Sequence, residues 1–245
     1  MSVPELDFAS AERLLEASDF LDCRLVWSSN VVYLAQLRSP DGQTFAAIYK
    51  PRKGERPLWD FPDGTLYLRE VAAYRFARML GWPLIPPTVI RDGPDGVGAL
   101  QVFIRHDPSS HFFVQREDPA LVPALQRMVL FDYVANNADR KGGHCLLDTD
   151  GRLWGIDHGL CFHAEYKLRT VMWDWAGDPI PQAWLDELRA VRDRLRAPAD
   201  AEAKRFLELL APDEEAALVR RIEAILRDGR FPLPGPHRSY PWPLV

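Results

Sequence analysis

The chain has 245 residues and a formal net charge of −5, and 47% of its residues are hydrophobic. This composition excludes wholesale disorder, and no apolar run reaches the ~18 residues that a membrane-spanning helix needs. The mild acidity argues against bulk electrostatic binding to nucleic acid or anionic lipid. Three cysteines without CxxC spacing, and an N-terminal stretch that is acidic where a secretory signal is basic, predict a cytoplasmic protein with reduced thiols.

The first 104 residues combine strand patterns with two helical patterns, as expected of a small antiparallel sheet with a helix packed on it. Apolar and polar residues alternate on both sides of a Pro-Asp-Gly turn, and the helical stretches place apolar residues at helical spacing. The expected elements are a helix at 8–18, a hairpin at about 24–50, a helix at 66–80 ended by Gly81, and two strands within 88–104. The sequence therefore predicts a β-β-α-β-β arrangement for this part.

The remainder of the chain is mostly helical, with one short hairpin and a Pro-rich end. The expected elements are an apolar helix at 119–136, a hairpin of 144–148 with 152–157, helices at 181–196 and 199–228 punctuated by Pro198 and Pro212, and an extended tail at 231–245. We therefore predict an α+β protein with a single domain over residues 1–245. Its parts are a β-rich lobe at about 1–104, a helical lobe at about 105–230, and the tail at 231–245.

The strongest functional signal is the segment Asn-Ala-Asp-Arg-Lys-Gly-Gly-His at 137–144, which follows the apolar helix and precedes Asp157 by thirteen residues. The hairpin between these clusters predicts that Asp139, His144 and Asp157 lie near one another. One carboxylate can then orient a hydroxyl for attack, while the other, with a neutral ligand, can hold Mg²⁺ on nucleotide phosphates. The alternative is a polar surface turn, but the apolar flanks of Asp157 would bury it, and a buried carboxylate without a partner is costly.

A second signal is Lys50, which ends an apolar strand and needs an anion if it points inward. Glu70, in the following helix, is a natural partner, and phosphate oxygens are another. Taken alone, Lys50 fits a surface lysine at a strand end, but the chain has only five lysines and carries the acidic cluster downstream, which favours function. The turn Ser28-Ser29-Asn30 can present backbone N–H groups and hydroxyls to phosphates, although the motif alone is weak.

The order of these residues resembles the phosphatidylinositol 3-/4-kinase superfamily, which has a protein-kinase-like fold. Ile-Tyr-Lys-Pro at 48–51 resembles the lysine strand of that family. The spacing from Asp139 to His144 matches its catalytic loop, D-R-x-x-x-N, and Ile-Asp-His-Gly-Leu at 156–160 resembles its metal-binding motif. The resemblance spans about 24–165 and is nearest to type II phosphatidylinositol 4-kinases and an uncharacterised actinobacterial-type group of related bacterial proteins. It implies a small antiparallel β lobe with one helix and a mainly helical large lobe.

The resemblance also implies roles for individual residues. Lys50 would contact the α- and β-phosphates of ATP, and Glu70 would position this lysine. Asp139 would be the catalytic-loop acid, with Arg140 bracing that loop, and Asp157 would be the main metal ligand.

The same resemblance places the hinge strand beside adenine at 100–104, which makes Gln101 and Phe103 candidate nucleotide contacts. One departure concerns His144, because the family usually has Asn at this position. A neutral imidazole can ligate a divalent ion, whereas Mg²⁺ prefers oxygen. Either the metal is held differently, which brings in Mn²⁺ as a second candidate, or phosphoryl transfer is impaired.

The leading hypothesis is an ATP-dependent kinase that transfers the γ-phosphoryl group to a hydroxyl acceptor. A protein or small-molecule acceptor is favoured over a lipid, because the acidic chain shows no amphipathic basic helix for a membrane surface. The alternatives are a nucleotide-binding pseudokinase that serves as a regulatory partner, favoured by His144, and an adenylyl transferase with ATP bound in reverse. Neither nucleic acid nor integral membrane association is expected.

Overall fold

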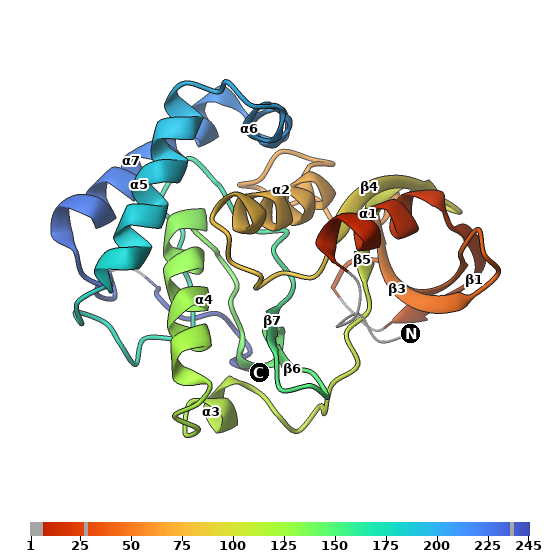
Figure 1. The fold of residues 1–245 in the computed structure, drawn as a ribbon, viewed down its shortest axis with the longest axis horizontal. Helices are drawn as coiled ribbons and strands as arrows, with labels where there is room; N and C mark the ends of the chain where they lie inside the picture. The colour runs from red at the N-terminus through yellow and green to blue at the C-terminus, as the bar shows by residue number, and fades with distance from the viewer. Residues whose placement is uncertain (1–6, 27–28, 236–237) are drawn as a thin grey trace.

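The computed structural model describes residues 7–26, 29–235 and 238–245. It has two lobes, with an antiparallel sheet on the right of Figure 1 and a group of helices on the left. Helix α2 (Leu66–Met79) lies between them and packs against strands β4 and β5 on one side and helix α6 on the other. The α+β class and the division into a β lobe and a helical lobe are therefore confirmed.

The N-terminal lobe is a five-stranded antiparallel sheet with the order β1-β2-β3-β5-β4. Its strands are β1 (Asp19–Val26), β2 (Val32–Arg38), β3 (Thr44–Pro51), β4 (Thr88–Gly93) and β5 (Gly96–Val102). In β3, Ala47 and Tyr49 are buried in a core that helix α1 (Phe8–Ala17) helps to cover. Because side chains alternate along a strand, Lys50 points to the opposite face.

Three strands precede α2, where the sequence predicted a single hairpin at about 24–50, so the predicted β-β-α-β-β order lacked one strand. The first of the three, β1, starts at Asp19 rather than near residue 24. It is the outer strand of the sheet and most of its side chains are exposed. Only Phe20 and Cys23 of β1 are partly buried against the core, so the strand lacks the regular alternation of apolar and polar residues that would identify it in the sequence.

The helical lobe is built around helix α4 (Val122–Ala135), nearly all of whose second half is buried. The other elements of this lobe are α3 (Phe112–Gln115), β6 (Cys145–Leu147), β7 (Leu153–Gly155), α5 (Gln182–Arg196), α6 (Ala201–Leu207) and α7 (Pro212–Asp228), with a 3₁₀ turn at Gly142–His144. Another 3₁₀ turn, Arg52–Gly54, follows β3 in the N-terminal lobe. One predicted boundary was wrong, because the apolar helix begins at Val122, three residues later than predicted. The expected interruption at Pro212 is present, since α6 ends at Leu207 and α7 begins at Pro212.

The last described segment, 238–245, runs along the helical lobe without regular secondary structure. The carbonyl of Ser239 accepts hydrogen bonds from the backbone N–H of Thr170 (3.0 Å) and the indole of Trp173 (3.1 Å), and the carbonyl of Leu244 accepts one from Gly142 (2.8 Å). The tail therefore ends beside the loop that carries Asp139 and His144.

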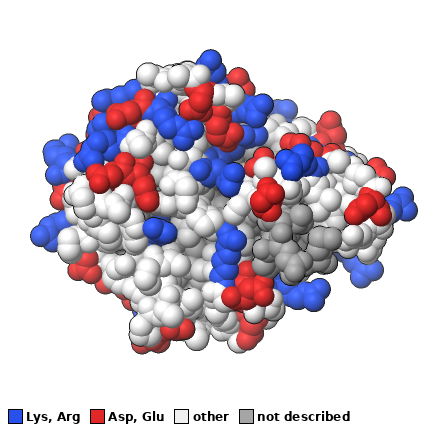
Figure 2. Space-filling view, in the orientation of Figure 1, with Lys and Arg blue, Asp and Glu red and all other residues white. Residues whose placement is uncertain are grey.

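None of the described helices is both long enough and apolar enough to cross a membrane. Cys145 and Cys161 are buried free thiols, and Cys23 is a half-buried one. Acidic and basic side chains are mixed over the face shown in Figure 2.

Candidate active site

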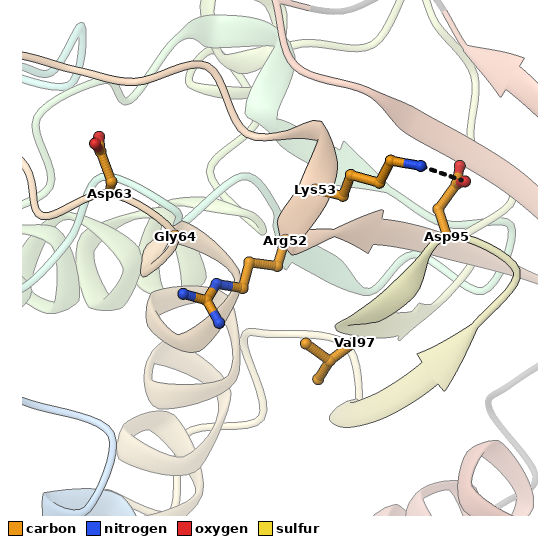
Figure 3. A pocket seen from close by; sticks show the side chains of 6 residues that line it. All are labelled: Arg52, Lys53, Asp63, Gly64, Asp95 and Val97. Atoms are coloured by element: carbon orange, nitrogen blue, oxygen red, sulfur yellow. Dashed lines mark ion pairs between the residues drawn. The ribbon is translucent and has the colours of Figure 1, made fainter.

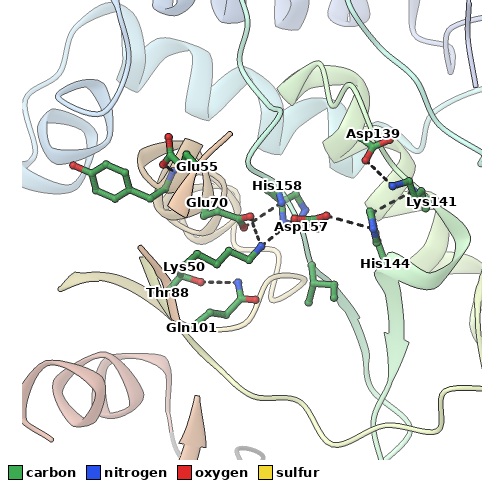
Figure 4. A network of polar contacts seen from close by, with 12 residues as sticks. Lys50, Glu55, Glu70, Thr88, Gln101, Asp139, Lys141, His144, Asp157 and His158 are labelled. Carbon is green, nitrogen blue, oxygen red and sulfur yellow. Dashed lines mark hydrogen bonds and ion pairs between the residues drawn. The ribbon is translucent and has the colours of Figure 1, made fainter. Parts of the chain in front are cut away.

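Lys50 lies at the centre of a polar network between the two lobes (Figure 4). Its ammonium group contacts one carboxylate oxygen of Glu70 and lies 3.0 Å from Oδ1 of Asp157. Burial disfavours the charged form of Lys50, but the carboxylates of Asp157 and Glu70 outweigh it and raise the pKa of this lysine above its usual value. The expected pair of Lys50 with Glu70 is therefore present, and the lysine is charged at neutral pH.

Glu70 comes from the second turn of α2 and is almost fully buried. Its second oxygen accepts a hydrogen bond from the backbone N–H of His158 at 3.1 Å. The start of α2 is itself fixed, because the carboxylate of Glu55 accepts the backbone N–H groups of Leu66 (3.1 Å) and Tyr67 (2.7 Å). These are first-turn donors without a partner inside the helix, so α2 is held in place at the point where it supplies Glu70.

Asp157 follows β7 directly and has a positive φ of 62°, which is uncommon for a residue with a side chain. This backbone turns its carboxylate toward the space between the lobes, where 48% of the side chain is exposed. Oδ1 meets Lys50, and Oδ2 lies 3.4 Å from Nε2 of His144. Lys50 holds the pKa of Asp157 far below its usual range, with burial opposing this effect. Such strained residues are concentrated at functional sites.

The loop after α4 carries Asp139, Lys141 and His144. The ammonium group of Lys141 lies 3.0 Å from Oδ2 of Asp139, and its backbone N–H is 3.4 Å from Nδ1 of His144. Burial raises the pKa of Asp139, an effect that the charge of Lys141 partly offsets. Burial also lowers the pKa of His144 to about 4, so the imidazole is neutral at pH 7. The predicted proximity of the three groups is present, with His144 next to Asp157.

Beneath this loop lies a buried network that the sequence analysis missed in part. Arg140 and Asp132 form an ion pair in which both side chains are 0% exposed, with Nε–Oδ2 at 2.7 Å and Nη2–Oδ1 at 3.0 Å. Arg140 also donates to the backbone carbonyls of His144 (3.2 Å) and Ile156 (2.9 Å), and lies 2.7 Å from Nε2 of His158. It therefore connects the two segments that carry the site, and its guanidinium group does not reach the space between the lobes.

Asp132 and Asn137 were absent from the predicted site. The side-chain amide of Asn137 donates to Asp132 at 2.9 Å, and its oxygen accepts the backbone N–H of Asp139 at 3.0 Å. One signal for Asp132 was available, since it is an acidic residue in the middle of an otherwise apolar helix. A buried carboxylate in such a place requires a charged or hydrogen-bonded partner.

A cavity of about 160 Å³ opens beside Lys50 and extends from the turn that was expected to bind phosphate to the two acidic residues Asp139 and Asp157. Its walls include Ser29, Asn30, Lys50, Asp139 and Asp157. The third residue of the predicted turn, Ser28, lies outside the described residues.

The phosphate turn is tied to the segment after β3. The side-chain oxygen of Asn30 accepts the backbone N–H of Arg56 at 2.9 Å, and Val31 donates to the carbonyl of Gly54, also at 2.9 Å. Gly54 is required there, because a Cβ atom at this position would lie 2.4 Å from that of Val31. Next to this segment is a more open hollow of about 440 Å³, in which Lys53 points toward Asp95 and Arg52 toward Gly64 (Figure 3).

Gln101 and Phe103 are placed differently from the other candidates. The side-chain amide of Gln101 is buried and donates to the hydroxyl of Thr88 on β4 at 2.8 Å. Phe103 follows β5, and its backbone N–H donates to the carbonyl of Ala46 at 3.3 Å. Neither residue lines the cavity beside Lys50. The side chain of Gln101 therefore connects β4 with β5. This contact depends on the register of the two strands, which places Gln101 opposite Thr88.

A divalent ion would find a donor in the Asp157 carboxylate, and a second donor in the neutral His144 imidazole in the tautomer that leaves Nε2 without a proton. No group of three or more His, Cys, Asp or Glu side chains within the described ranges has the geometry of a preformed metal centre. A pair of donors fits an ion that arrives on nucleotide phosphates, because Mg²⁺ commonly takes one or two protein ligands and completes its shell with phosphates and water.

This geometry defines a class of protein. A lysine at the end of the third strand, paired with a glutamate on the helix that follows and facing two acidic residues across a cleft, is the arrangement of a kinase-like fold. A hydra Fam20 protein, solved with sugar, superposes with a TM-score of 0.52 at 14% identity, covering 90% of this chain and 87% of that one. At this low identity the similarity shows the fold alone.

The chain belongs to the phosphatidylinositol 3- and 4-kinase family, whose model matches residues 91–221, more than half of the sequence. The match includes Asp139, His144 and Asp157 and excludes Lys50 and Glu70. Protein Rv2133c of Mycobacterium tuberculosis is 40% identical over 86% of this chain and 90% of its own length. Phosphatidylinositol 4-kinase gamma 4 of rice, Oryza sativa subsp. japonica, is 28% identical over 75% of this chain, which spans 36% of the rice protein. The resemblance seen in the motifs is thus confirmed at the level of the family.

Proposed function

We propose that the protein is an ATP-dependent phosphotransferase that moves the γ-phosphoryl group of ATP to a hydroxyl acceptor. The main support for this proposal is that Lys50 forms ion pairs with both Glu70 and Asp157. These residues line a cavity that Asp139 also borders. Phosphoryl transfer depends mainly on positioning and charge stabilisation, and this site supplies a fixed cation and two acidic groups in separate surroundings.

Each residue has a distinct part in this proposal. Lys50, charged and held by Glu70, binds the phosphates of ATP, while the backbone and side chains of Ser29 and Asn30 approach them from the turn above. Asp139 orients the acceptor hydroxyl and takes its proton, a task helped by the raised pKa of this carboxyl.

Asp157 and His144 would hold a divalent ion, Mg²⁺ or Mn²⁺, which would neutralise charge on the phosphates when it is bound. Asp157 offers a carboxylate with a low pKa, so it stays ionised under all ordinary conditions. His144 offers a neutral imidazole, which suits Mn²⁺ better than Mg²⁺. For the acceptor we favour a protein or a small molecule over a lipid, because acidic and basic side chains are mixed over the face in Figure 2 and the sequence shows no basic amphipathic helix.

His144 also favours a second candidate function, a pseudokinase that binds nucleotide without transferring phosphate. Its Nδ1 faces the N–H of Lys141, which leaves the proton on Nε2, toward Asp157. In that tautomer the imidazole directs its N–H toward the Asp157 carboxylate and has no free lone pair there for a metal ion.

One assay separates these functions from each other and from adenylyl transfer. The protein is incubated with ATP labelled in the γ- or the α-phosphate, with Mg²⁺ or Mn²⁺, in the presence of protein and small-molecule acceptors. Transfer of γ-label supports the kinase, and transfer of α-label supports adenylyl transfer. Nucleotide binding without transfer of either label supports the pseudokinase, and no binding at all refutes the proposal.

A further inference from the structure

Two adjacent residues of α2 point in different directions and attach the helix to different parts of the molecule. Glu70 faces the cleft and holds Lys50, while Arg69, about 100° further round the helix, faces the helical lobe. The Arg69 side chain is as deeply buried as that of Glu70. A buried arginine next to the glutamate of the cleft has no part in the proposed chemistry and requires a separate explanation.

Arg69 makes two charge-assisted contacts across the lobes. Its Nη2 lies 2.5 Å from Oε1 of Glu214 in the first turn of α7, and its Nη1 donates to the carbonyl of Cys161 at 2.6 Å. The guanidinium group also lies over the ring of Phe61, 5.0 Å from its centre. Glu214 is fully engaged, since its second oxygen accepts the backbone N–H of Ala211 at 3.0 Å. Both charges are fixed in direction by these bonds.

The contacts of Arg69 and Glu70 hold both ends of residues 158–161, the segment that directly follows Asp157. Glu70 accepts the N–H of His158 on one side, and Arg69 donates to the carbonyl of Cys161 on the other. A shift or rotation of α2 would break both bonds together and leave the Arg69–Glu214 charges buried without partners, which is costly. The position of α2 is therefore coupled to α7, which is 145 residues away in sequence.

We infer that Arg69 and Glu214 are positioning residues that hold α2 in the one arrangement in which Glu70 can orient Lys50 toward the cleft. The α2 helix of this protein is thereby fixed from the helical lobe. Only the nucleotide-binding readout of this inference rests on the proposed function, because the placement of α2 can be measured without nucleotide.

The test compares Glu214→Gln with a matched control, Glu202→Gln. Glu202 of α6 also forms an ion pair with α2, through Arg75 at 3.1 Å, but both side chains of that pair are partly exposed and neither adjoins Glu70. Amide hydrogen exchange is measured over residues 66–79 of α2 and, as an internal reference, over residues 122–135 of α4. Binding of ATP with Mg²⁺ is measured by calorimetry on the same samples.

We expect faster exchange in α2 and unchanged exchange in α4 for Glu214→Gln, with wild-type behaviour for Glu202→Gln. We also expect the dissociation constant for ATP to rise about tenfold in Glu214→Gln, the scale of one lost hydrogen bond to a charged group. Wild-type protection of α2 in Glu214→Gln would overturn the inference. If wild type binds no ATP, the proposed function fails, and the exchange data still decide the placement of α2.

If Glu214→Gln does not fold, the double variant Arg69→Met/Glu214→Met takes its place, since it leaves no lone buried charge and such replacements are often neutral. Positioning by the ion pair predicts that this variant is stable, yet has a loosened α2 and weakened nucleotide binding. A stable double variant with wild-type α2 exchange would show that the pair serves stability only, and would overturn the inference.

Discussion

The buried ion pair beneath the catalytic loop gives the sharpest prediction for stability. Asp132→Asn removes the charge that faces Arg140, and both side chains are completely buried. Removing one partner of a buried pair costs about 3–5 kcal/mol. Because Asn keeps one oxygen that can still accept a hydrogen bond from Arg140, we expect the lower end of the range, about 3 kcal/mol. That is a large part of the ~5–15 kcal/mol by which a domain is stable.

The assay is urea unfolding followed by tryptophan fluorescence, repeated as a thermal melt. For a chain of this size, about 3 kcal/mol corresponds to a fall in Tm of roughly 6–12 °C. The matched control is Asp186→Asn, which breaks an ion pair with Arg189 whose side chains are 56% and 46% exposed. An exposed pair of this kind contributes about 0–1 kcal/mol. The reasoning is refuted if Asp132→Asn and Asp186→Asn destabilise the protein equally.

Three further substitutions test the separate parts of the cleft. Lys50→Met should weaken ATP binding at least about tenfold, as calorimetry can check, because the lysine faces the cavity. Asp139→Asn should bind ATP within about twofold of wild type and lose at least ~100-fold in label transfer, since its part is played only in the transition state. If the imidazole is only a metal ligand, His144→Asn should raise label transfer with Mg²⁺ relative to transfer with Mn²⁺. A loss of transfer with both ions would show that His144 has a role other than metal binding.

The sequence was most informative where local pattern and chemistry coincide. Lys50 ends an apolar strand and needs a counter-ion, and Glu70 was the available acid on the next helix, so their pairing followed from composition and order. The hairpin of β6 and β7 likewise placed His144 near Asp157, because β6 begins directly after His144 and β7 ends two residues before Asp157.

Other features depend on three-dimensional register and had no local signal. The network of Asp132, Arg140 and His158 forms because the chain reverses at Asn136, which adopts a left-handed conformation with φ of 56°. The pairing of Gln101 with Thr88 depends on the register of β4 and β5.

The contact between Arg69 and Glu214 joins residues that are 145 positions apart in the sequence. Hydrophobic periodicity identifies a helix face as buried, but it does not identify which distant helix will cover it.

The central claim is that the cleft binds ATP with a divalent ion through Asp157, and one calorimetric comparison tests it most directly. ATP is titrated into wild type and into Asp157→Asn, each with Mg²⁺, with Mn²⁺ and with EDTA. We predict that wild type binds ATP more tightly with a divalent ion than with EDTA, and that at about 100 times the dissociation constant the nucleotide stabilises the fold by ~2.7 kcal/mol. Asp157→Asn should bind ATP with the same affinity under all three conditions. Absence of ATP binding in wild type, or a metal dependence that survives in Asp157→Asn, would contradict the account.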